Sequence, residues 1–325
     1  MHPLRARLLA HREAGGRLGG SVVLRTSREH GRHIRGLQHA LAGIARHKRP
    51  AGRSRQAPEE RLIQRFIMRL TIAIAAALFA VTGAAAAKEW KEIRIATEGA
   101  YPPFNFVGSD GELQGFDVDI AKALCDKVGA KCTIVAQDWD GLIPALIANK
   151  YDAIAASMSI TEERKQQVDF TQRYASTPVS FVAPKDTQLT GVAPADLKGK
   201  IVGAQSSTTH ATMLEDVYAP EGVTVKLYPT LDEANADLKS GRVDTVFADK
   251  IVLLDWLKKD GADCCKVLGD VDDKQYAQHF GEGIGLAVRK EDQDLKDLLS
   301  KAIADIRADG TYDTIAKKYF DFEIY

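Results

Sequence analysis

Apolar strand-like stretches and amphipathic stretches alternate along most of this chain, and that alternation limits its fold more than any other feature. Residues 92–96, 132–136 and 151–157 predict strands, and residues 118–128 and 141–150 predict the helices between them. Strands that are joined through helices run parallel. This part of the chain therefore predicts an open, mostly parallel sheet with helices on its faces.

The same pattern returns after an extended run over residues 174–184. Further strands are predicted at 200–204, 223–228 and 243–248, with helices at 209–218, 231–240 and 249–259. The chain then turns back at 266–268 and ends with a strand at 283–288 and helices at 292–309 and 315–319. We therefore expect two α/β lobes, with the chain crossing between them twice and polar residues lining a cleft between them.

One predicted strand-to-helix junction, ASMSITEER over residues 156–164, contains the groups that a carboxylate site needs. Ser157 and Ser159 are two residues apart and face the same way on a strand. Thr161 is a candidate N-cap, and Arg164 follows within the first turn of the helix. A guanidinium beside hydroxyls and free helix N–H groups can bind both oxygens of a carboxylate. The alternative is an ordinary junction with a surface arginine.

Polar residues also follow the other predicted strands. The loop at 97–104, the run at 137–140 and the run at 205–210 each come directly after a strand, and Asp249 ends another strand. Ligands bind at this edge of open α/β sheets. The simpler explanations are helix capping for the hydroxyls and for Asp249, and solvent exposure for the acids.

The first 67 residues differ in charge from the rest of the chain. They hold fifteen Lys+Arg against four acidic residues, whereas the remainder carries 29 basic and 40 acidic residues. Such asymmetry is typical of a nucleic-acid-binding arm or a targeting segment. We favour a third interpretation, in which the protein starts at Met68 and residues 1–67 are an untranslated or disordered extension.

Residues 68–87 are typical of a cleaved secretory signal peptide. Arg69 precedes an apolar run over 70–81, and four alanines end at Ala87. The apolar run is short for a membrane span. Cleavage after Ala87 would leave 28 basic and 40 acidic residues, a balance that disfavours nucleic acid and attracts cations. An unusually long leader and an uncleaved anchor are the alternatives.

The cysteines agree with export into an oxidising compartment. Cys125 and Cys132 flank the end of a predicted helix and the start of a strand, so a disulfide between them would tie the two together. Two free, buried thiols are the alternative. The state of the adjacent Cys264 and Cys265 is left open. No His/Cys spacing suggests zinc, and we expect no metal and no cofactor.

Several motifs, in this order and with these gaps, give the chain a family resemblance over residues 88–325. They are EGAYPPF (98–104), GFDVDI (115–120), WDGLIPAL (139–146), SMSITEER (157–164), QSSTT (205–209), and DGTY with KKYFD in the tail (309–321). The chain resembles the periplasmic basic amino-acid-binding proteins of bacterial ABC importers, which include lysine/arginine/ornithine-, arginine/ornithine- and histidine-binding proteins.

The resemblance implies the two-lobed periplasmic-binding-protein fold (type II), an α/β architecture with a ligand cleft between lobes joined by two hinge strands. We expect lobe 1 to comprise residues 88–177 plus 274–325 and lobe 2 to comprise residues 182–266. The hinges are expected at about 177–181 and 267–273. Cys125 and Cys132 match a disulfide found in that group.

The resemblance also implies how the two backbone ends of an amino acid are held. Arg164 and Ser159, with backbone groups of Ser157 and Thr208, would bind the α-carboxylate. Asp249 would pair with the α-ammonium, helped by Ser157. Because the charged partners come from facing lobes, a bound amino acid would hold the cleft shut.

The ligand side chain would lie between Tyr101 and Trp139, whose rings suit an aliphatic stem or a guanidinium. Glu98 and Asp117 would face the distal cation, because two carboxylates close together favour a positive charge. Glu98 stands where several relatives have Asp. The remaining predicted site residues are Ala156, Ser207 and Thr209, and Ala156 stands where some relatives have Ser.

We therefore expect a monomeric periplasmic protein, not an enzyme, that captures a cationic L-amino acid (arginine, ornithine, lysine or histidine). It would deliver the ligand to an ABC permease in the inner membrane and would not bind nucleic acid. One alternative is an opine-binding protein of the same family. The other is a dehydratase-like enzyme on the same scaffold, with Glu98 and Asp117 as its acid/base pair.

Overall fold

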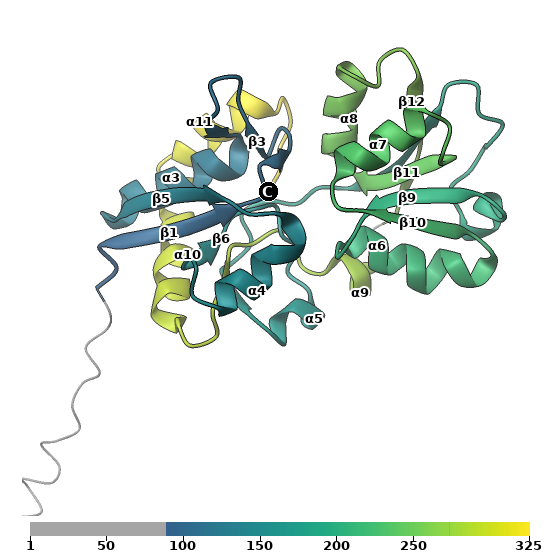
Figure 1. The fold of residues 1–325 in the computed structure, drawn as a ribbon. Helices are drawn as coiled ribbons and strands as arrows, with labels where there is room; N and C mark the ends of the chain where they lie inside the picture. Colours follow the sequence, from purple (N-terminus) through teal and green to yellow (C-terminus); the bar gives the residue numbers. More distant parts are fainter. Residues whose placement is uncertain (1–88, 273) are drawn as a thin grey trace, which may run out of the picture. The chain divides into compact units, whose positions relative to one another are not determined.

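The computed structural model of the protein describes residues 89–272 and 274–325, and Figure 1 labels their elements. The expected extension at 1–67 and the expected signal peptide at 68–87 lie outside the described residues. Within the described part of the chain, no helix combines the length and the apolar character needed to cross a membrane.

The first sheet has five strands in the order β5-β1-β6-β13-β7. Its strands are β1 (Glu92–Thr97), β5 (Lys131–Ala136), β6 (Ala153–Ile154), β7 (Asp169–Phe170) and β13 (Ala287–Val288). β1 pairs in parallel with β5 and β6, whereas β13 pairs antiparallel with β6 and β7. The sheet is therefore mixed, and only its β5-β1-β6 part has the predicted parallel arrangement.

Helices cover this sheet because each presents an apolar stripe to it. Leu124, Leu299 and Ile303 pack with Ile93 and Ile95 of β1 in one buried cluster. A second cluster joins the helix at Leu142–Ile147 to β6 and β7. The helical elements of this part are α3 (Phe116–Val128), η1 (Trp139–Gly141), α4 (Leu142–Ile147), α5 (Glu162–Lys165), α10 (Gln293–Ala308) and α11 (Thr311–Tyr319). We call these elements and their sheet lobe 1.

The second sheet also has five strands, in the order β10-β9-β11-β8-β12. Its strands are β8 (Val179–Pro184), β9 (Ile201–Gln205), β10 (Thr224–Tyr228), β11 (Thr245–Asp249) and β12 (Cys265–Val271). β9 pairs in parallel with β10 and β11, and β8 pairs antiparallel with β11 and β12. On one face, the rings of Phe181 and Phe247 stack with centroids 4.3 Å apart in a buried cluster.

The helical elements beside the second sheet complete lobe 2. They are η2 (Pro194–Leu197), α6 (Thr209–Met213), η3 (Leu214–Tyr218), η4 (Ala219–Glu221), α7 (Leu231–Lys239), α8 (Lys250–Lys258) and α9 (Ala277–Phe280). Because β8 and β12 pair with each other inside this sheet, the chain passes between the sheets before Val179 and after Val271. Most of the residues at 177–181 and 267–273 thus lie in paired strands. Phe280 of α9 packs against the buried cluster of the second sheet, so we group α9 with lobe 2, whereas the expected limits put residues 274–325 in lobe 1. The hinges and the other lobe limits stay predictions.

A small antiparallel sheet replaces the open loop expected after β1. It consists of β2 (Ala100–Tyr101), β3 (Asn105–Val107) and β4 (Leu113–Gln114). Gly115 leads from this sheet into α3 with φ of 120°, and a Cβ there would lie 2.3 Å from the carbonyl oxygen of Phe104. Only glycine permits this close approach, which sets the start of α3 and the position of Asp117.

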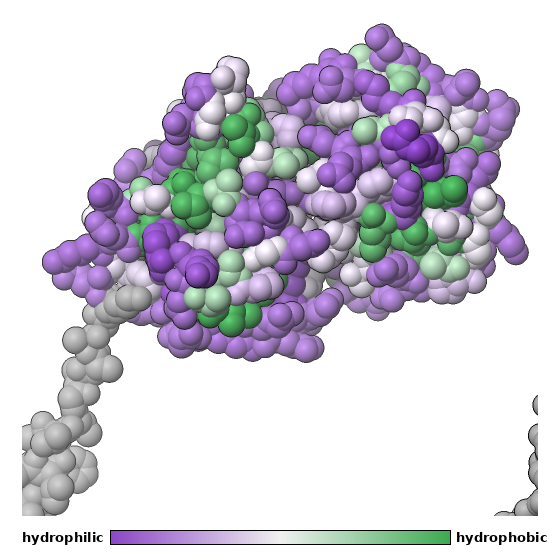
Figure 2. Space-filling view, in the orientation of Figure 1, coloured by the Kyte–Doolittle hydropathy of each residue, from purple (hydrophilic) through white to green (hydrophobic). Residues whose placement is uncertain are grey.

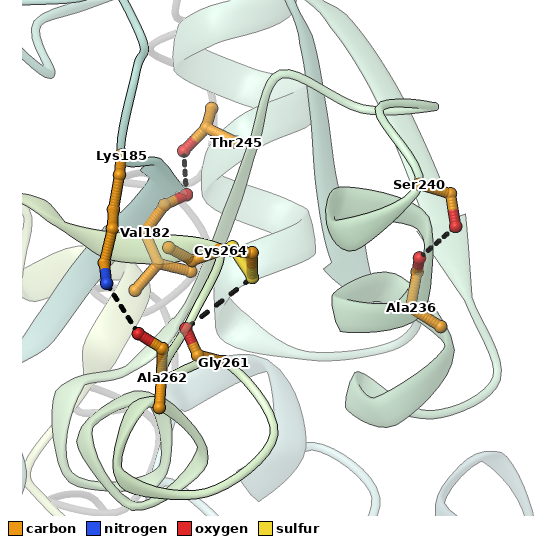
Figure 3. Close-up of a disulfide and its surroundings, with 9 residues drawn as sticks. Val182, Lys185, Ala236, Ser240, Thr245, Gly261, Ala262 and Cys264 are labelled. Atoms are coloured by element: carbon orange, nitrogen blue, oxygen red, sulfur yellow. Dashed lines mark hydrogen bonds between the residues drawn. A yellow bond between two sulfur atoms is a disulfide. The ribbon is translucent and has the colours of Figure 1, made fainter.

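Both cysteine pairs are disulfide-bonded. Cys125 of α3 is joined to Cys132 of β5, as expected. Cys264 and Cys265, whose state the sequence left open, are joined to each other at the start of β12 (Figure 3). The sulfur of Cys264 also lies 3.6 Å from the carbonyl oxygen of Gly261.

Hydrophilic side chains cover most of the face in Figure 2, with smaller hydrophobic patches between them. Among the described residues, the exposed large hydrophobic side chains are Val107, Ile147, Leu227 and Phe322. The large apolar side chains otherwise gather in the clusters beneath the helices.

We predict that Cys125→Ala/Cys132→Ala lowers the free energy of unfolding by about 2 kcal/mol, because the cross-link closes a short loop in the unfolded chain. Cys264→Ala/Cys265→Ala is the matched control and should cost less, since its loop contains no intervening residue. Denaturant unfolding of both variants tests this. An equal or larger loss in the control would contradict it.

Candidate functional site

A small cavity of about 20 Å³ lies where strand ends of the two lobes meet, and both lobes line it. Lobe 1 contributes Glu98, Tyr101, Trp139, Ala156, Ser157, Ser159 and Arg164. Lobe 2 contributes Gln205, Thr208, Thr209, His210 and Asp249. The structure thus brings together every predicted site residue except Asp117 and Ser207. The cavity has room for about one water molecule, so an amino acid needs its walls to separate or its side chains to turn away.

Arg164 lies buried in the lobe 1 side of the cavity, at the helix start that the sequence predicted. Thr161 caps α5, its hydroxyl accepting from the Arg164 N–H at 3.2 Å. The guanidinium, in a residue only 9% exposed, donates to the carbonyl oxygens of Ser159 (3.0 Å) and Ser207 (3.2 Å). Burial lowers the pKa of Arg164 to about 10, so the group stays cationic at neutral pH.

Arg164 makes no ion pair with any residue that the structure describes. The ring of Trp139 lies 5.4 Å from its guanidinium carbon, and the indole N–H donates to the carbonyl oxygen of Ser207 at 3.2 Å. A buried cation that has carbonyl and aromatic partners but no carboxylate favours an anion beside it. This is the strongest electrostatic feature of the cavity.

Asp249 provides the opposite charge from lobe 2. It occupies the N-cap position of α8, but its side chain makes no capping hydrogen bond. The simpler explanation, that Asp249 only caps a helix, therefore does not account for its carboxylate. That carboxylate instead accepts from the Tyr101 hydroxyl at 2.6 Å, and its other oxygen lies 3.7 Å from His210 Nε2.

Glu98 is a half-buried carboxyl whose oxygen accepts from Gln205 Nε2 at 2.5 Å. The pKa of Glu98 is raised to about 7, mainly by burial and also by the nearby carboxylates of Asp232, Asp138 and Asp140, against the opposing effect of the Gln205 bond. The surroundings of Glu98 thus resist a negative charge unless a cation is present.

Asp117 is buried behind the cavity wall, which differs from the expectation that it would face a ligand cation. Its carboxyl accepts from Asn105 Nδ2 (2.9 Å), Ser157 Oγ (2.9 Å) and the Tyr174 hydroxyl (2.7 Å). Burial raises its pKa to about 6. These bonds fix Ser157, whose hydroxyl donates to Asp117. Its oxygen can still accept from an ammonium, so the expected help from Ser157 stays a prediction.

Two serines at the cavity adopt left-handed backbone conformations, Ser157 with φ of 49° and Ser207 with φ of 55°. Such conformations are uncommon for serine and are held by their surroundings. β6 itself ends at Ile154, so the strand predicted over 151–157 is shorter than expected and Ser157 lies beyond it. Ser207 is exposed and outside the cavity lining, and its carbonyl oxygen, not its hydroxyl, meets Arg164 and Trp139.

The two threonines of lobe 2 have different surroundings. Thr208 caps α6, its hydroxyl accepting from the Ala211 N–H at 3.1 Å and donating to the carbonyl oxygen of Gln205. Helix capping thus accounts for its side chain, and a ligand would meet its backbone. Thr209 is buried and lines the cavity.

Sequence reasoning missed Gln205 and His210 as cavity residues. Gln205 belongs to the QSSTT motif and is the last residue of β9, the position at which ligands are met in such sheets, so a signal was present. His210 had no recognisable signal, because its cavity neighbour Asp249 lies 39 positions away in the chain.

The fold and this cavity define a class of two-lobed α/β proteins that bind a small charged molecule between their lobes. The chain belongs to the bacterial extracellular solute-binding proteins, family 3, whose family model matches residues 93–322.

Among similar proteins, the L-arginine-binding protein of Pseudomonas aeruginosa is 45% identical over 236 residues, covering 72% of this chain and 90% of the relative. The histidine-binding periplasmic protein of Salmonella typhimurium is 40% identical over 258 residues, covering 79% of this chain and 97% of the relative. The structure of an ancestral arginine-binding protein bound to arginine matches with a TM-score of 0.66 at 40% identity, covering 71% of this chain and 98% of that one. These findings confirm the expected fold and family.

We predict that ionisation of Glu98 lowers the free energy of unfolding of the ligand-free protein as pH rises from about 5 to 7. Its folded pKa of about 7 lies above the ordinary 4.5, so the native state binds the proton more tightly and stability falls with rising pH in that window. Glu98→Gln should remove up to about 3 kcal/mol of this decline, as followed by thermal unfolding.

Glu112→Gln, at an exposed position, is the matched control and should keep the wild-type slope. Asp117 titrates in all three proteins, so the difference between them isolates Glu98. An unchanged pH slope in Glu98→Gln would contradict the prediction.

Proposed function

We propose that this protein is the solute-binding component of an ABC transporter, which captures a cationic L-amino acid in the periplasm and delivers it to the membrane permease. The observation that carries the proposal is a cavity with two opposite charges from facing lobes. Lobe 1 supplies a buried guanidinium that has no ion-pair partner among the described residues, and lobe 2 supplies a carboxylate that makes no helix-capping hydrogen bond. An amino-acid zwitterion has the complementary pair of charges. The arginine- and histidine-binding relatives support the same class of ligand.

The α-carboxylate would bind at Arg164, with Ser159 and the backbone of Ser157 and Thr208 beside it. The guanidinium donates to the carbonyl oxygen of Ser159 in its own lobe, and this bond can orient it before a ligand arrives. Its second bond, to the carbonyl oxygen of Ser207, comes from lobe 2 and depends on the lobes meeting. A pre-oriented guanidinium loses little side-chain entropy on binding.

The α-ammonium would bind at Asp249. The Tyr101 hydroxyl, which donates to this carboxylate at 2.6 Å, would share it with the ammonium or give way to it. The Tyr101 bond is already charge-assisted, because its acceptor is a carboxylate. The ammonium adds a full opposite charge where the hydroxyl supplies only a dipole, so the exchange favours the ligand.

The ligand side chain would extend between Tyr101 and Trp139 toward Glu98. A guanidinium or ammonium there would let Glu98 ionise, and Gln205 can turn its amide oxygen toward the same cation. Arginine, ornithine, lysine and histidine all carry such a group. Asp117 would act indirectly, by holding Ser157 in place.

Closure of the lobes would complete the site, because the groups that surround the ligand come from both lobes. The bonds that each charged group makes to the facing lobe show that these groups can come within hydrogen-bond distance. We place the bending near the points where the chain leaves the second sheet, before Val179 and after Val271. A few residues at element ends can absorb such a hinge motion. The protein would work as a monomer in the periplasm.

A dehydratase-like reaction is not favoured, for a specific reason. Glu98 lines the cavity, whereas Asp117 lies behind Ser157 with all its bonds directed to protein groups. The two carboxyl groups therefore do not form an acid/base pair around a shared ligand. Turnover of prephenate-like acids by the purified protein would overturn this view.

We predict that arginine raises the melting temperature, by an amount equal to about 2.7 kcal/mol of stability when its concentration is 100 times Kd. Arg164→Ala should weaken arginine binding at least a hundredfold, since the ligand carboxylate loses its counter-charge. Calorimetric titration measures both proteins.

Arg173→Ala, which removes an exposed arginine outside the cavity, is the matched control and should bind as wild type does. Retention of wild-type affinity by Arg164→Ala, or no stabilisation by arginine, ornithine, lysine or histidine, would disprove the proposal.

We also predict that arginine affinity rises as pH increases through about 7. The bound cation favours ionised Glu98, so below its pKa of about 7 each pH unit should cost up to about tenfold in Kd. Titrations between pH 5.5 and 8.5 test this, with Glu98→Gln as the comparison. A Glu98→Gln variant that keeps the full pH dependence would rule Glu98 out as its source.

A further inference from the structure

His210 is a buried residue of the cavity to which the proposed function gives no role. It is the second residue of α6 and is 5% exposed. Its ring meets the ring of Phe247 edge-on, with centroids 5.1 Å apart and planes at 85°, and lies 5.9 Å from the ring of Phe280. Because both neighbours are bulky and apolar, they fix the ring without supplying it with a hydrogen bond.

The Nε2 atom of His210 has no hydrogen-bond partner among the residues that the structure describes. It lies 3.7 Å from Asp249 Oδ1, which is beyond hydrogen-bond length. The other polar groups near this carboxylate are the Tyr101 hydroxyl of β2, which donates to Oδ2, and Arg164 of α5, which lines the same cavity. Buried polar atoms in native proteins are nearly always satisfied, so an unsatisfied one in a cavity wall points to a ligand.

We propose that His210 accepts a hydrogen bond from the α-ammonium of the bound amino acid, and thereby selects ligands whose α-nitrogen is unsubstituted. This inference rests on the proposed function. A neutral imidazole accepts through one ring nitrogen, and an ammonium has three N–H donors. Two acceptors 3.7 Å apart can both reach one nitrogen, so Asp249 would supply the charge and His210 a second hydrogen bond.

The same arrangement excludes opine-type ligands, whose α-nitrogen carries a carboxyalkyl group. Such a substituent leaves two N–H groups on the nitrogen. Where the substituent takes the position that faces His210, it removes that hydrogen bond and places carbon atoms against the imidazole. Phe247 and Phe280 hold the ring and leave it little freedom to move aside. Selection against a substituted nitrogen thus comes from a lost hydrogen bond and a steric clash together.

A doubly protonated His210 ring would have the opposite effect on arginine binding. Both ring nitrogens of an imidazolium are donors, so it could not accept a hydrogen bond from the ligand. It would instead pair with Asp249 and repel an incoming ammonium. Removal of His210 would then strengthen arginine binding, whereas under our proposal it weakens binding.

The test uses calorimetric titration of wild type, His210→Phe and His210→Ala with three probes. These are arginine, 5-guanidinopentanoate (which lacks the α-amino group) and Nα-methylarginine. His210→Phe keeps a ring of similar size but removes the acceptor. His279→Phe makes the same change at a buried histidine outside the cavity lining and is the matched control. Thermal unfolding establishes that each variant is folded.

We expect His210→Phe to weaken arginine binding at least about tenfold while changing the affinity for 5-guanidinopentanoate less than about twofold. His210→Ala, which also opens space, should reduce the preference for arginine over Nα-methylarginine at least about tenfold. His279→Phe should match wild type. If His210→Phe does not fold, the His210→Ala comparison decides the matter alone.

Equal losses for arginine and 5-guanidinopentanoate, an unchanged preference in His210→Ala, or tighter arginine binding by either His210 variant would overturn the inference. Each of these results leaves the proposed function standing, because wild type still binds arginine. If wild type binds none of the cationic amino acids, the proposed function itself fails, and the inference fails with it.

Discussion

The arrangement of this molecule depends on one buried cation that lacks a counter-ion among the described residues. Within its own lobe, Arg164 is held by the Thr161 cap and by the carbonyl oxygen of Ser159, and these bonds do not depend on the position of lobe 2. Removing a charge from water without a partner is costly unless a ligand supplies the partner. The site is therefore built to be completed by an anion, and the rest of the cavity determines which anion fits.

The carboxyl groups around Arg164 differ in accessibility, and this difference separates their roles. Asp249 has an uncapped side chain in the cavity, Glu98 lies in the cavity among other acids, and Asp117 lies behind it with its oxygens occupied. Burial raises the pKa of both Glu98 and Asp117, but only Glu98 can be relieved by a ligand cation. Selectivity for a positively charged side chain would thus depend on Glu98.

Much of this could be predicted from the sequence, because strand ends in open α/β sheets collect polar residues at one edge. That rule located Arg164 and Asp249 correctly in one cavity. It could not show that Ser157 turns into a left-handed conformation and donates to Asp117, since that geometry depends on Asn105 and Tyr174 from other elements. The rule also could not predict the antiparallel strands β8 and β13, because their pairing joins segments that are far apart in the chain.

Each charged group of the cavity has a neutral partner on the facing lobe. The Ser207 carbonyl meets Arg164, the Tyr101 hydroxyl meets Asp249, and the Gln205 amide meets Glu98. These bonds can hold the lobes together, and a bond with one ionised partner is already charge-assisted. A neutral partner nevertheless leaves the charge uncompensated, whereas an amino acid would bring an opposite charge to the same atom. The affinity of a ligand would therefore depend on how much stronger its own bonds to these groups are than the bonds between the lobes that they replace. A ligand that lacks one of its three charges would leave one of these neutral contacts in place and would bind more weakly. Affinity would therefore depend on the α-carboxylate, the α-ammonium and the side-chain cation together.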